Sequence, residues 1–422
     1  MFLTHLTLEH FRNYRSLSHD FAAPFTLIQG RNAQGKTNLL EAIYYLATSK
    51  SSHARTEKEV VGWSAEGEPI PYSRIRGLVQ QSGGEVELEI LFSSRGGSEE
   101  TFAKQVRVNG VNRRGIDLIG NLRAVLFLPE DVVLVAGSPG ERRRYLDIAL
   151  CQIDRNYTQH LSRYQKVTTQ RNSLLRRLRE ENASYRDPGV VAQLRFWDEQ
   201  LVEHGAFVLA RRYGFLARLD PAARTIHREL SAGLEHLQLV YQPSFDPGFL
   251  GEPDYRRLIK GDITPHTGRL PDTPLTLAAL QETFLKKLDS RRSREMAAGA
   301  TLYGPHRDDM AFLVNERDLR TYGSRGQQRT GALALKLAEV QAMTAETGET
   351  PILLLDDVMS ELDAQRRATL LAALAGVSQA VVTATDWEDF SPEFRAQAQL
   401  LHVDSGRLTT SHLSAQQNNT AA

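Results

Sequence analysis

The sequence has few of the features that mark secreted, membrane or thiolate-metal proteins. Cys151 is the only cysteine in 422 residues, so the chain cannot form an intramolecular disulfide and lacks the usual thiolate metal motifs. No uninterrupted apolar run approaches the length of a membrane span, and the first residues show no basic segment followed by an apolar one. We therefore expect a cytoplasmic protein without a membrane anchor of its own.

Neither sign of charge predominates. The 51 Lys and Arg residues balance 51 Asp and Glu residues, which excludes a simple polycation that coats nucleic acid along its whole length. An anionic partner must instead meet local basic clusters. The hydrophobic fraction of 41% and the charged fraction of 24% are typical of folded globular proteins, and the length suffices for two or three domains.

A glycine-flanked stretch, G-R-N-A-Q-G-K-T at 30–37, matches the P-loop pattern G-x-x-x-x-G-K-[ST]. The apolar run F-T-L-I precedes it and N-L-L-E-A-I-Y-Y-L-A follows with helical spacing, so the loop is expected to connect a strand to a helix. In such a loop, backbone N–H groups surround phosphates, the lysine reaches the β- and γ-phosphates, and the threonine hydroxyl binds Mg²⁺. The predicted nucleotide-binding residues are Gly30, Arg31, Asn32, Ala33, Gln34, Gly35, Lys36 and Thr37.

Two carboxylates stand at the end of an apolar run, I-L-L-L-D-D at 352–357. A magnesium nucleotide site needs such a Walker B acid at the end of a buried strand. Asp356 is the predicted metal ligand together with Thr37, and Asp357 follows where a carboxylate orients the attacking water. We therefore expect ATP and Mg²⁺ as cofactors, with Lys36, Asp356 and Asp357 acting in catalysis.

The order of segments predicts an α/β protein interrupted by a helical insertion. Residues 1–137 read as strands and a helix, and 300–405 return to this character after the helical patterns of 138–299. Because the P-loop and the Walker B acids lie on opposite sides of the insertion, 1–137 and 300–405 are expected to fold together as one domain. The break Asp187-Pro188-Gly189 predicts two antiparallel helices in the arm, and 406–422 are predicted to be a mobile tail.

A second candidate anion-binding element is T-Y-G-S-R-G-Q-Q-R at 321–329, which precedes another helical pattern. A Ser-x-Gly before a helix is usually only a cap. Here it comes ahead of the Walker B strand, which favours a role in phosphate binding by the helix N-terminus. Ser324, Gly326 and Gln327 are the candidate residues.

These motifs, in this order, resemble the ABC-type ATPase heads of the SMC family and, within it, the RecF family. The resemblance extends over about residues 1–405 and implies a P-loop ATPase head with an inserted, mainly helical arm domain. Beside the P-loop, S-R-G-Q-Q-R and L-L-L-D-D, it is carried by S-E-L-D at 360–363, F-R-N-Y at 11–14, P-E-D at 129–131, S-P-G-E-R-R-R-Y-L-D at 138–147 and G-P-H-R-D-D at 304–309.

The resemblance implies that ATP is held between two copies of the chain. Ser324, Gly326 and Gln327 of one copy would cap the γ-phosphate on the P-loop of the other, and Asp363 would lie across the interface. The implied activity is slow ATP hydrolysis in an ATP-dependent homodimer. The implied role is DNA replication and recombinational repair after DNA damage, at single-strand gaps and junctions of single- and double-stranded DNA. RecR-type and RecO-type mediator proteins would be partners in loading the RecA recombinase.

Several positions depart from the usual ABC pattern. Arg325 occupies a position that is glycine in typical signatures, so it is a candidate for contact with phosphate or DNA. Asp357 replaces the usual glutamate, and its shorter side chain predicts slow turnover. The histidine often found after the next strand is missing from V-V-T-A-T-D at 381–386, and Glu130 or Asp131 occupies the region of the usual Q-loop glutamine.

Two local basic clusters are candidates for DNA phosphate contact. Residues 141–180 contain ten Arg or Lys against four Asp or Glu, and residues 286–294 contain five against one. Such clusters predict salt-sensitive, weakly sequence-selective binding. Because Arg142, Arg143 and Arg144 are consecutive, they cannot share one helix face, so at least one is expected to be structural. His306 and Arg307 are functional candidates by the resemblance alone.

Two other classes of protein share part of this pattern. The ATPase subunit of a membrane transporter also has a P-loop, a signature and a Walker B acid, but the long insertion and the arginine clusters argue against it. A small-molecule kinase would leave S-R-G-Q-Q-R at 324–329 without a role.

Overall fold

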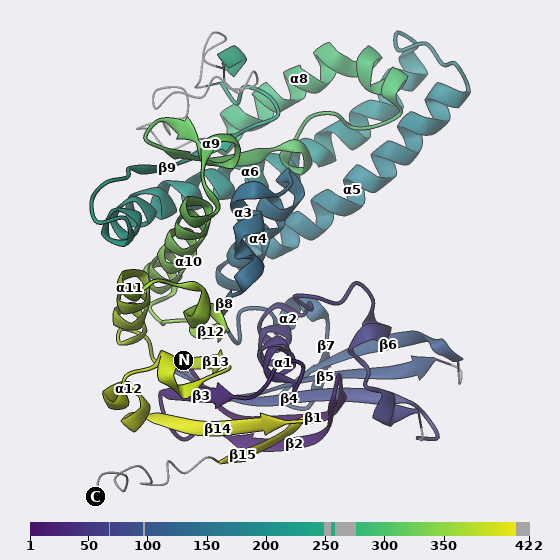
Figure 1. Ribbon diagram of the computed structural model, residues 1–422. Coiled ribbons are helices and arrows are strands. Elements are labelled where there is room, and N and C mark those ends of the chain that lie inside the picture. Colours follow the sequence, from purple (N-terminus) through teal and green to yellow (C-terminus); the bar gives the residue numbers. More distant parts are fainter. Residues whose placement is uncertain (67, 96–97, 249–254, 258–275, 411–422) are drawn as a thin grey trace, which may run out of the picture. The chain divides into compact units, whose positions relative to one another are not determined.

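The computed structural model describes residues 1–66, 68–95, 98–248, 255–257 and 276–410 (Figure 1). These residues form two compact units. The first unit comprises Met1–Pro129 and the described residues from Met343 onward, and the second unit comprises Glu130–Ala342. The long helix α10 (Arg325–Thr347) contains the second division point.

The first unit contains two sheets in the described residues. The antiparallel sheet is ordered β2 (Tyr14–Asp20), β1 (Phe2–Phe11), β4 (Tyr72–Gln81), β5 (Gly84–Arg95), β6 (Ser98–Val108) and β7 (Val111–Arg113). The second sheet is ordered β15 (Arg407–Thr410), β14 (Ala398–Asp404), β3 (Phe25–Gln29), β13 (Ala380–Ala384), β12 (Ile352–Asp356) and β8 (Ala124–Phe127). All neighbours in this second sheet are parallel except β14 and β15. β6 pairs with β7 across the tight turn at Asn109-Gly110.

Helix α1 (Lys36–Thr48) packs against strands of both sheets. Its side chains Leu39, Leu40, Ile43 and Leu46 are fully or almost fully buried, as their helical spacing predicted. The Leu46 side chain reaches Gly77 of β4, where a Cβ atom would come within 2.8 Å of it. The helix that follows the P-loop is thereby fixed by the core of the first unit. Shorter helices of this unit are α2 (Gly115–Leu118), α11 (Ala364–Leu374) and α12 (Pro392–Ala396).

Segments from both ends of the chain are neighbours in the parallel sheet. β3 lies between β14 and β13, with Phe25 opposite both Ala398 and Ala380 (Figure 1). β13 in turn lies between β3 and β12. The strand before the P-loop and the strand before the Walker B acids are therefore separated by a single strand, although they are far apart in the sequence.

The second unit is mainly helical. The break at 187–189 is confirmed, because α5 ends at Glu180 and α6 begins at Pro188, with Asp187 as its N-cap. Asp154 ends the first predicted helix and caps the next, so the pattern from Ser138 to Tyr164 forms two helices rather than one. The helices are α3 (Val133–Ala136), α4 (Pro139–Ile153), α5 (Arg155–Glu180), α6 (Pro188–Leu230), α8 (Leu277–Ala298) and α9 (Leu319–Tyr322).

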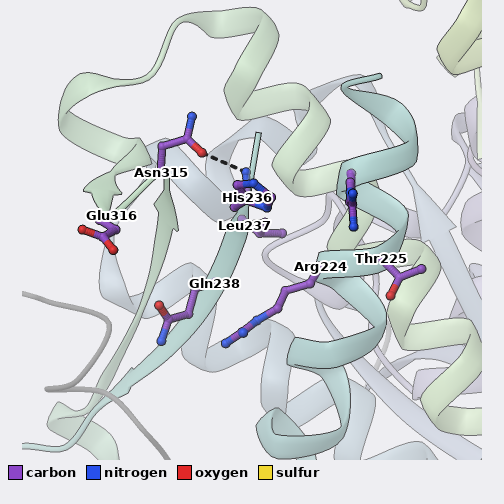
Figure 2. Close-up of a pocket in the computed structure, with 8 residues that line it drawn as sticks. Arg224, Thr225, His236, Leu237, Gln238, Asn315 and Glu316 are labelled. Atoms are coloured by element: carbon purple, nitrogen blue, oxygen red, sulfur yellow. Dashed lines mark hydrogen bonds between the residues drawn. The ribbon is translucent and has the colours of Figure 1, made fainter. Parts of the chain in front are cut away.

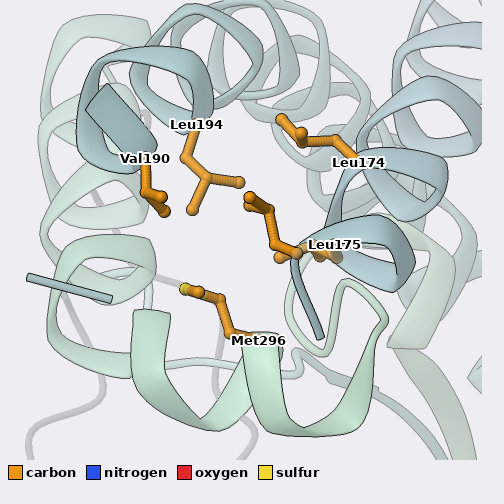
Figure 3. Packing of buried hydrophobic residues seen from close by; sticks show 6 residues of the cluster. Leu174, Leu175, Val190, Leu194 and Met296 are labelled. Carbon is orange, nitrogen blue, oxygen red and sulfur yellow. The ribbon is translucent and has the colours of Figure 1, made fainter. Parts of the chain in front are cut away.

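One apolar cluster holds α5, α6 and α8 together. Figure 3 shows Leu174 and Leu175 of α5 facing Val190 and Leu194 of α6, with Met296 of α8 closing the group. All five side chains are buried. Burial of a leucine or methionine contributes about 1.5–3 kcal/mol, so this cluster fixes α8 against the other two helices.

The division between the units differs from the predicted domain boundaries at 138 and 300. Residues 300–342 lie in the second unit. There β10 (Asp309–Val314) pairs with β9 (Leu237–Gln242) and with the short β11 (Arg317–Asp318), rather than joining the P-loop sheet. The sequence pattern indicated an apolar strand at 311–314 but could not indicate its partner.

The predicted mobile tail at 406–422 begins with ordered structure, since β15 pairs with β14 from Arg407 to Thr410. Residues 411–422 of that tail lie outside the described residues.

Within the part of the chain that the structure describes, no helix is long and apolar enough to span a membrane. Cys151, the only cysteine of the sequence, is half-buried in α4.

Candidate nucleotide site

The P-loop connects β3 to α1, as predicted. Gly35 is the N-cap of α1 and has φ 119°, a backbone conformation that only glycine adopts without strain. A Cβ atom on Gly35 would come within 2.7 Å of Asn13 Nδ2, and one on Gly30 would come within 2.6 Å of the Val403 carbonyl oxygen. Both glycines of the motif are therefore required by close packing of the loop.

Lys36 is buried beneath the loop, with 6% of its surface exposed. Its ammonium group donates a hydrogen bond of 2.5 Å to the Gly30 carbonyl oxygen, across the base of the loop. Burial lowers the pKa of Lys36, while the carboxylates of Asp357 and Asp356 act in the opposite direction. The ammonium group thus lies within the electrostatic influence of both predicted Walker B acids.

Asp356 and Thr37 come together as predicted. The Thr37 hydroxyl donates a hydrogen bond of 2.6 Å to Asp356 Oδ2, and the Thr383 hydroxyl of β13 lies 2.8 Å from Asp356 Oδ1. Thr383 Oγ1 also accepts a hydrogen bond of 3.0 Å from the Asp357 backbone N–H. The intervening strand β13 thereby fixes both Walker B residues through one buried side chain.

Asp357 has φ 50°, in the left-handed region, where it starts the short 3-10 helix Val358–Glu361. Its Oδ1 atom is buried and has no hydrogen-bond partner in the described structure. Burial raises the pKa of Asp357, and the ammonium of Lys36 opposes this shift. Because its Oδ1 atom has no partner, this half-buried carboxylate is chemically suited to orient a water molecule or to accept a proton from it.

The N-terminal F-R-N-Y segment holds the P-loop from outside. Asn13 Nδ2 donates a hydrogen bond of 2.8 Å to the Gln34 carbonyl oxygen, and the Tyr14 hydroxyl donates one of 2.9 Å to the Gly35 carbonyl oxygen. From the other end of the chain, the Ser405 N–H donates to the Gln34 side chain at 2.7 Å, and the Gly406 N–H donates to the Gln34 carbonyl at 3.0 Å. The middle of the loop is thus fixed from two sides.

Arg12, in the same segment, pairs with a buried acid on α1. Its guanidinium makes a two-pronged contact with the Glu41 carboxylate at 2.8 and 2.9 Å, and Glu41 also accepts a hydrogen bond from Ser51. Since Glu41 is 1% exposed, this pairing offsets the cost of burying its charge. Arg12 therefore links β1 to the helix that follows the P-loop.

The sequence pattern did not indicate that Asn13, Tyr14, Thr383 or Ser405 contribute to this site. F-R-N-Y at 11–14 supported only the family resemblance, and Thr383 lies in the segment where a histidine is missing. A polar residue inside the otherwise apolar strand A-V-V-T-A could have indicated a role for Thr383.

The candidate residues Ser324, Gly326 and Gln327, called the signature below, lie in the second unit at the start of α10. Ser324 and Gln327 form a capping box, in which the Ser324 N–H donates to Gln327 Oε1 at 2.8 Å and the Gln327 N–H donates to Ser324 Oγ at 3.2 Å. Gln327 Nε2 donates to Glu235 Oε1 at 2.7 Å. Ser324 and Arg325 are exposed, and Gly326 is half-buried. The hydroxyl proton of Ser324 remains available to a bound anion.

Two other candidate residues, Asp363 and Asp131, have structural contacts. Asp363 caps α11 by accepting from the Arg366 N–H at 2.9 Å, and its side chain stays exposed. Asp131 lies 3.8 Å from Lys336 Nζ of α10 within the second unit. Its neighbour Glu130 is exposed and belongs to the short 3-10 helix Pro129–Val132.

Arg142 and His306 have structural roles. Arg142 is 2% exposed and makes a two-pronged contact with Asp309 at 2.7 and 2.8 Å, which confirms that one of the three consecutive arginines is structural. His306 Nε2 lies 3.1 Å from the Thr301 carbonyl, so Nε2 carries the proton and Nδ1 accepts from the Tyr164 hydroxyl at 2.6 Å. Burial lowers the pKa of His306 to about 4. Arg307 is exposed.

Known proteins are similar to this chain over nearly its whole length. Residues 2–406 match the family described as RecF/RecN/SMC N terminal domain. A protein of Chloroflexus aurantiacus named DNA replication and repair protein RecF is 43% identical over 97% of this chain and 99% of its own length. A protein of the same name from Enterococcus faecalis is 39% identical over 97% and 98%. A solved structure of the recombination mediator protein RecF with ATP in the RecFOR pathway has a TM-score of 0.80 at 31% identity and covers 97% of this chain and 98% of its own.

A more distant structure, of an Smc head bound to the C-winged helix domain of ScpA, is 14% identical with a TM-score of 0.51 and shows the same fold. Fold and site together define a P-loop ATPase of the ABC/SMC type. The chain belongs to the RecF family of these ATPases. The predicted fold class and the predicted family are thereby confirmed.

Proposed function

We propose that this protein is an ATP-gated, DNA-binding dimer of recombinational repair. The observation that carries the proposal is that two candidate phosphate-binding elements belong to different units. In the first unit Lys36 donates to the Gly30 carbonyl oxygen and Thr37 donates to Asp356. In the second unit the capped helix start at Ser324 is exposed. Two copies of the chain would each contribute one element to a shared ATP.

The residues of the P-loop fit ATP and Mg²⁺. Lys36 would exchange the Gly30 carbonyl for phosphate oxygens, and Thr37 and Asp356 would hold Mg²⁺, which would neutralise charge on the phosphates. No group of three or more His, Cys, Asp or Glu side chains that could hold a metal occurs in the described residues. Such a small protein donor set fits Mg²⁺, which usually keeps water and phosphate ligands.

The free Oδ1 atom of Asp357 would orient the attacking water. Because aspartate has a shorter reach than the usual glutamate, we expect slow hydrolysis that serves as a timed switch. The helix start at Ser324 would bind the γ-phosphate of the partner copy through the Ser324 hydroxyl and backbone N–H groups, with Gly326 allowing close approach. Loss of the γ-phosphate would remove this contact and release the dimer.

DNA would be held through its phosphates. Arg163 and Lys166 on α5, and Arg291 and Arg294 on α8, are exposed and have no ion pair in the described structure. They come from the two basic clusters of the sequence. The expected binding is salt-sensitive and weakly selective for sequence. RecR-type and RecO-type partners are supported by the description of the related RecF structure as a recombination mediator in the RecFOR pathway. With these partners the protein would act at gaps and at junctions of single- and double-stranded DNA and would assist RecA loading.

The two alternative functions find less support. The similar proteins described above are RecF proteins and an Smc head, not transporter subunits. A small-molecule kinase would not need the capped, exposed helix start at Ser324.

The shared-site proposal is tested by analytical ultracentrifugation with and without Mg-ATP. The wild type is expected to form dimers only with ATP. Lys36→Met should lose them because nucleotide binding fails, and Ser324→Arg should lose them because the partner's contact with the γ-phosphate is blocked. Asp357→Asn should keep its dimers, since binding survives while hydrolysis slows.

Ser290→Arg is the matched control for Ser324→Arg, because Ser290 is an exposed serine on α8 of the same unit. It should dimerise as the wild type does. Normal ATP-dependent dimers of Ser324→Arg, or an isolated monomer that hydrolyses ATP at the full rate, would overturn the proposal.

A further inference from the structure

A basic pocket lies in the second unit. It has a volume of about 610 Å³ and is bounded by the last turns of α6, the start of β9 and the turn between β10 and β11. Figure 2 shows Arg224 extending from α6 toward Gln238 of β9, with Asn315 and His236 along another edge. None of the predicted site residues lines this pocket.

Two arginines dominate the charge of the pocket. Arg228 is exposed, and its guanidinium has no ion pair or hydrogen bond in the described structure. Arg224 pairs with Asp220 at 2.6 Å but remains 51% exposed, and Asp220 also accepts a hydrogen bond from the Leu239 N–H. Among the described residues, the acid that lines the pocket is Glu316, in the turn. The pocket therefore attracts an anion.

Neutral donors add to these guanidinium groups. Asn315 Oδ1 accepts a hydrogen bond of 3.0 Å from the His236 backbone N–H, so its amide N–H groups point the other way. Figure 2 shows this amide nitrogen directed away from His236. The exposed imidazole of His236 and the Gln238 side chain are further polar groups of the lining.

We propose that this pocket binds backbone phosphates of DNA. The inference rests on the proposed DNA-binding function and names one of its contact sites. Guanidinium forks match phosphate oxygens, and no Phe, Tyr or Trp that could stack on bases lines the pocket among the described residues. Leu237 is the aliphatic residue of the described lining and is 2% exposed, so this lining offers no apolar anchor to a protein partner.

The pocket is joined to the signature by one residue. Glu235 precedes His236 and accepts the hydrogen bond from Gln327, which caps Ser324. A phosphate bound at His236 would therefore lie one residue away from Glu235, whose carboxylate holds the Gln327 side chain. Occupation of the pocket is expected to increase ATP hydrolysis, because it orders the segment that positions Gln327.

The test uses the full chain with Mg-ATP and a fluorescent duplex that carries a single-strand gap, titrated by fluorescence anisotropy over a salt series. The variant is the double substitution Arg224→Gln, Arg228→Gln. It is expected to weaken DNA binding on the order of tenfold and to reduce the slope of log K against log salt by about one to two. The increase of ATP hydrolysis on addition of DNA should fall in parallel.

The matched control is Arg195→Gln, Arg186→Gln. Arg195 lies on the same helix as Arg224, pairs with an acid one turn away and is 52% exposed, while Arg186 is exposed in the segment before α6. Both arginines lie outside the two basic clusters of the sequence. The control removes the same charge without touching the pocket, and it should retain the wild-type salt slope. Thermal unfolding of both variants should match the wild type, because all four arginines are exposed.

The outcomes separate the two proposals. If the wild type does not bind DNA, the proposed function itself fails. If the wild type binds but the pocket variant and the control show the same affinity and slope, the pocket proposal alone is overturned. A pocket variant that keeps its DNA affinity but loses binding of an acidic peptide would also overturn it.

Discussion

The hydroxyl of Thr37 and the carboxylate of Asp356 are joined by a hydrogen bond of 2.6 Å that connects the first turn of α1 to the end of β12. The other oxygen of Asp356 accepts a hydrogen bond from the Thr383 hydroxyl, so hydrogen bonds hold both carboxylate oxygens in place. Such pre-organisation reduces the rearrangement needed when a metal arrives.

Thr383→Val should reduce ATP hydrolysis more than ATP binding. Valine has nearly the same shape but cannot bond the Asp356 carboxylate or accept from the Asp357 N–H, so both Walker B residues lose a fixed partner. We expect a loss of about 1–3 kcal/mol in stability, together with a lower kcat at a similar KM. Steady-state ATPase assays and urea unfolding measure the two effects.

Thr26→Val is the control for this substitution. Thr26 is a fully buried residue of β3, in the same sheet, and its hydroxyl has no hydrogen-bond partner in the described structure. Its replacement should leave both kcat and stability unchanged or slightly improve stability. A Thr383→Val protein that behaves like Thr26→Val would contradict a positioning role for Thr383.

Arg171→Met should strongly destabilise the second unit. Arg171 is 1% exposed and pairs with Asp198 at 2.7 Å and Glu295 at 2.6 Å, both of which are buried. Its removal leaves two uncompensated buried acids, at an expected cost of about 3–5 kcal/mol. Fluorescence of Trp197 reports on this unit once Trp63 and Trp387 have been replaced by phenylalanine.

Arg177→Met, on the same helix, is the control for Arg171→Met. Its ion pair with Glu181 is long, at 3.9 Å, and both side chains are exposed. The expected change in the free energy of unfolding is within about 0.5 kcal/mol. Equal effects of the two substitutions would show that the buried pairs do not stabilise this unit.

His306 should make the second unit less stable in acid. Its folded-state pKa of about 4 lies below the ordinary value of 6.5, so the unfolded state binds more protons between these values. Stability is then fully present above pH 6.5 and falls by about 3 kcal/mol as the pH decreases toward 4. Urea unfolding of the wild type and His306→Gln from pH 7 to 4 should give a smaller decrease for the variant. Parallel curves would contradict the assignment.

Glu339 has the opposite pH dependence. Burial raises the pKa of this carboxyl group on α10 to about 7, although Lys336 lowers it, and Oε2 has no partner in the described structure. The folded state therefore binds more protons between pH 4.5 and 7, and stability falls as the pH rises through this window. Glu339→Gln should be about 2–3 kcal/mol more stable than the wild type at pH 8, with no such gain at pH 4.5. A gain at both pH values would contradict ionisation as its cause.

The sequence was most informative where one short segment determines its own conformation. The glycines at 30 and 35 and the helical spacing after Lys36 predicted the strand, loop and helix, and the structure confirms all three. The apolar run ending at Asp356 likewise predicted the Walker B strand and its position beside Thr37.

Long-range pairing was less predictable. The apolar residues of β10 showed that a strand exists, but its pairing with β9 depends on side chains more than sixty residues away in sequence. The contacts of Asn13 and Ser405 with Gln34 were not predicted for the same reason, since hydrogen bonds between distant polar residues leave no periodic pattern.

The position of β14 beside β3 has a consequence for synthesis of the chain. Gln34 receives hydrogen bonds from Ser405 and Gly406, so the phosphate loop reaches its final shape only after nearly the entire polypeptide has left the ribosome. A nascent chain that ends before residue 398 contains every residue of the loop but lacks strand β14 and the Ser405 and Gly406 N–H groups that hold Gln34.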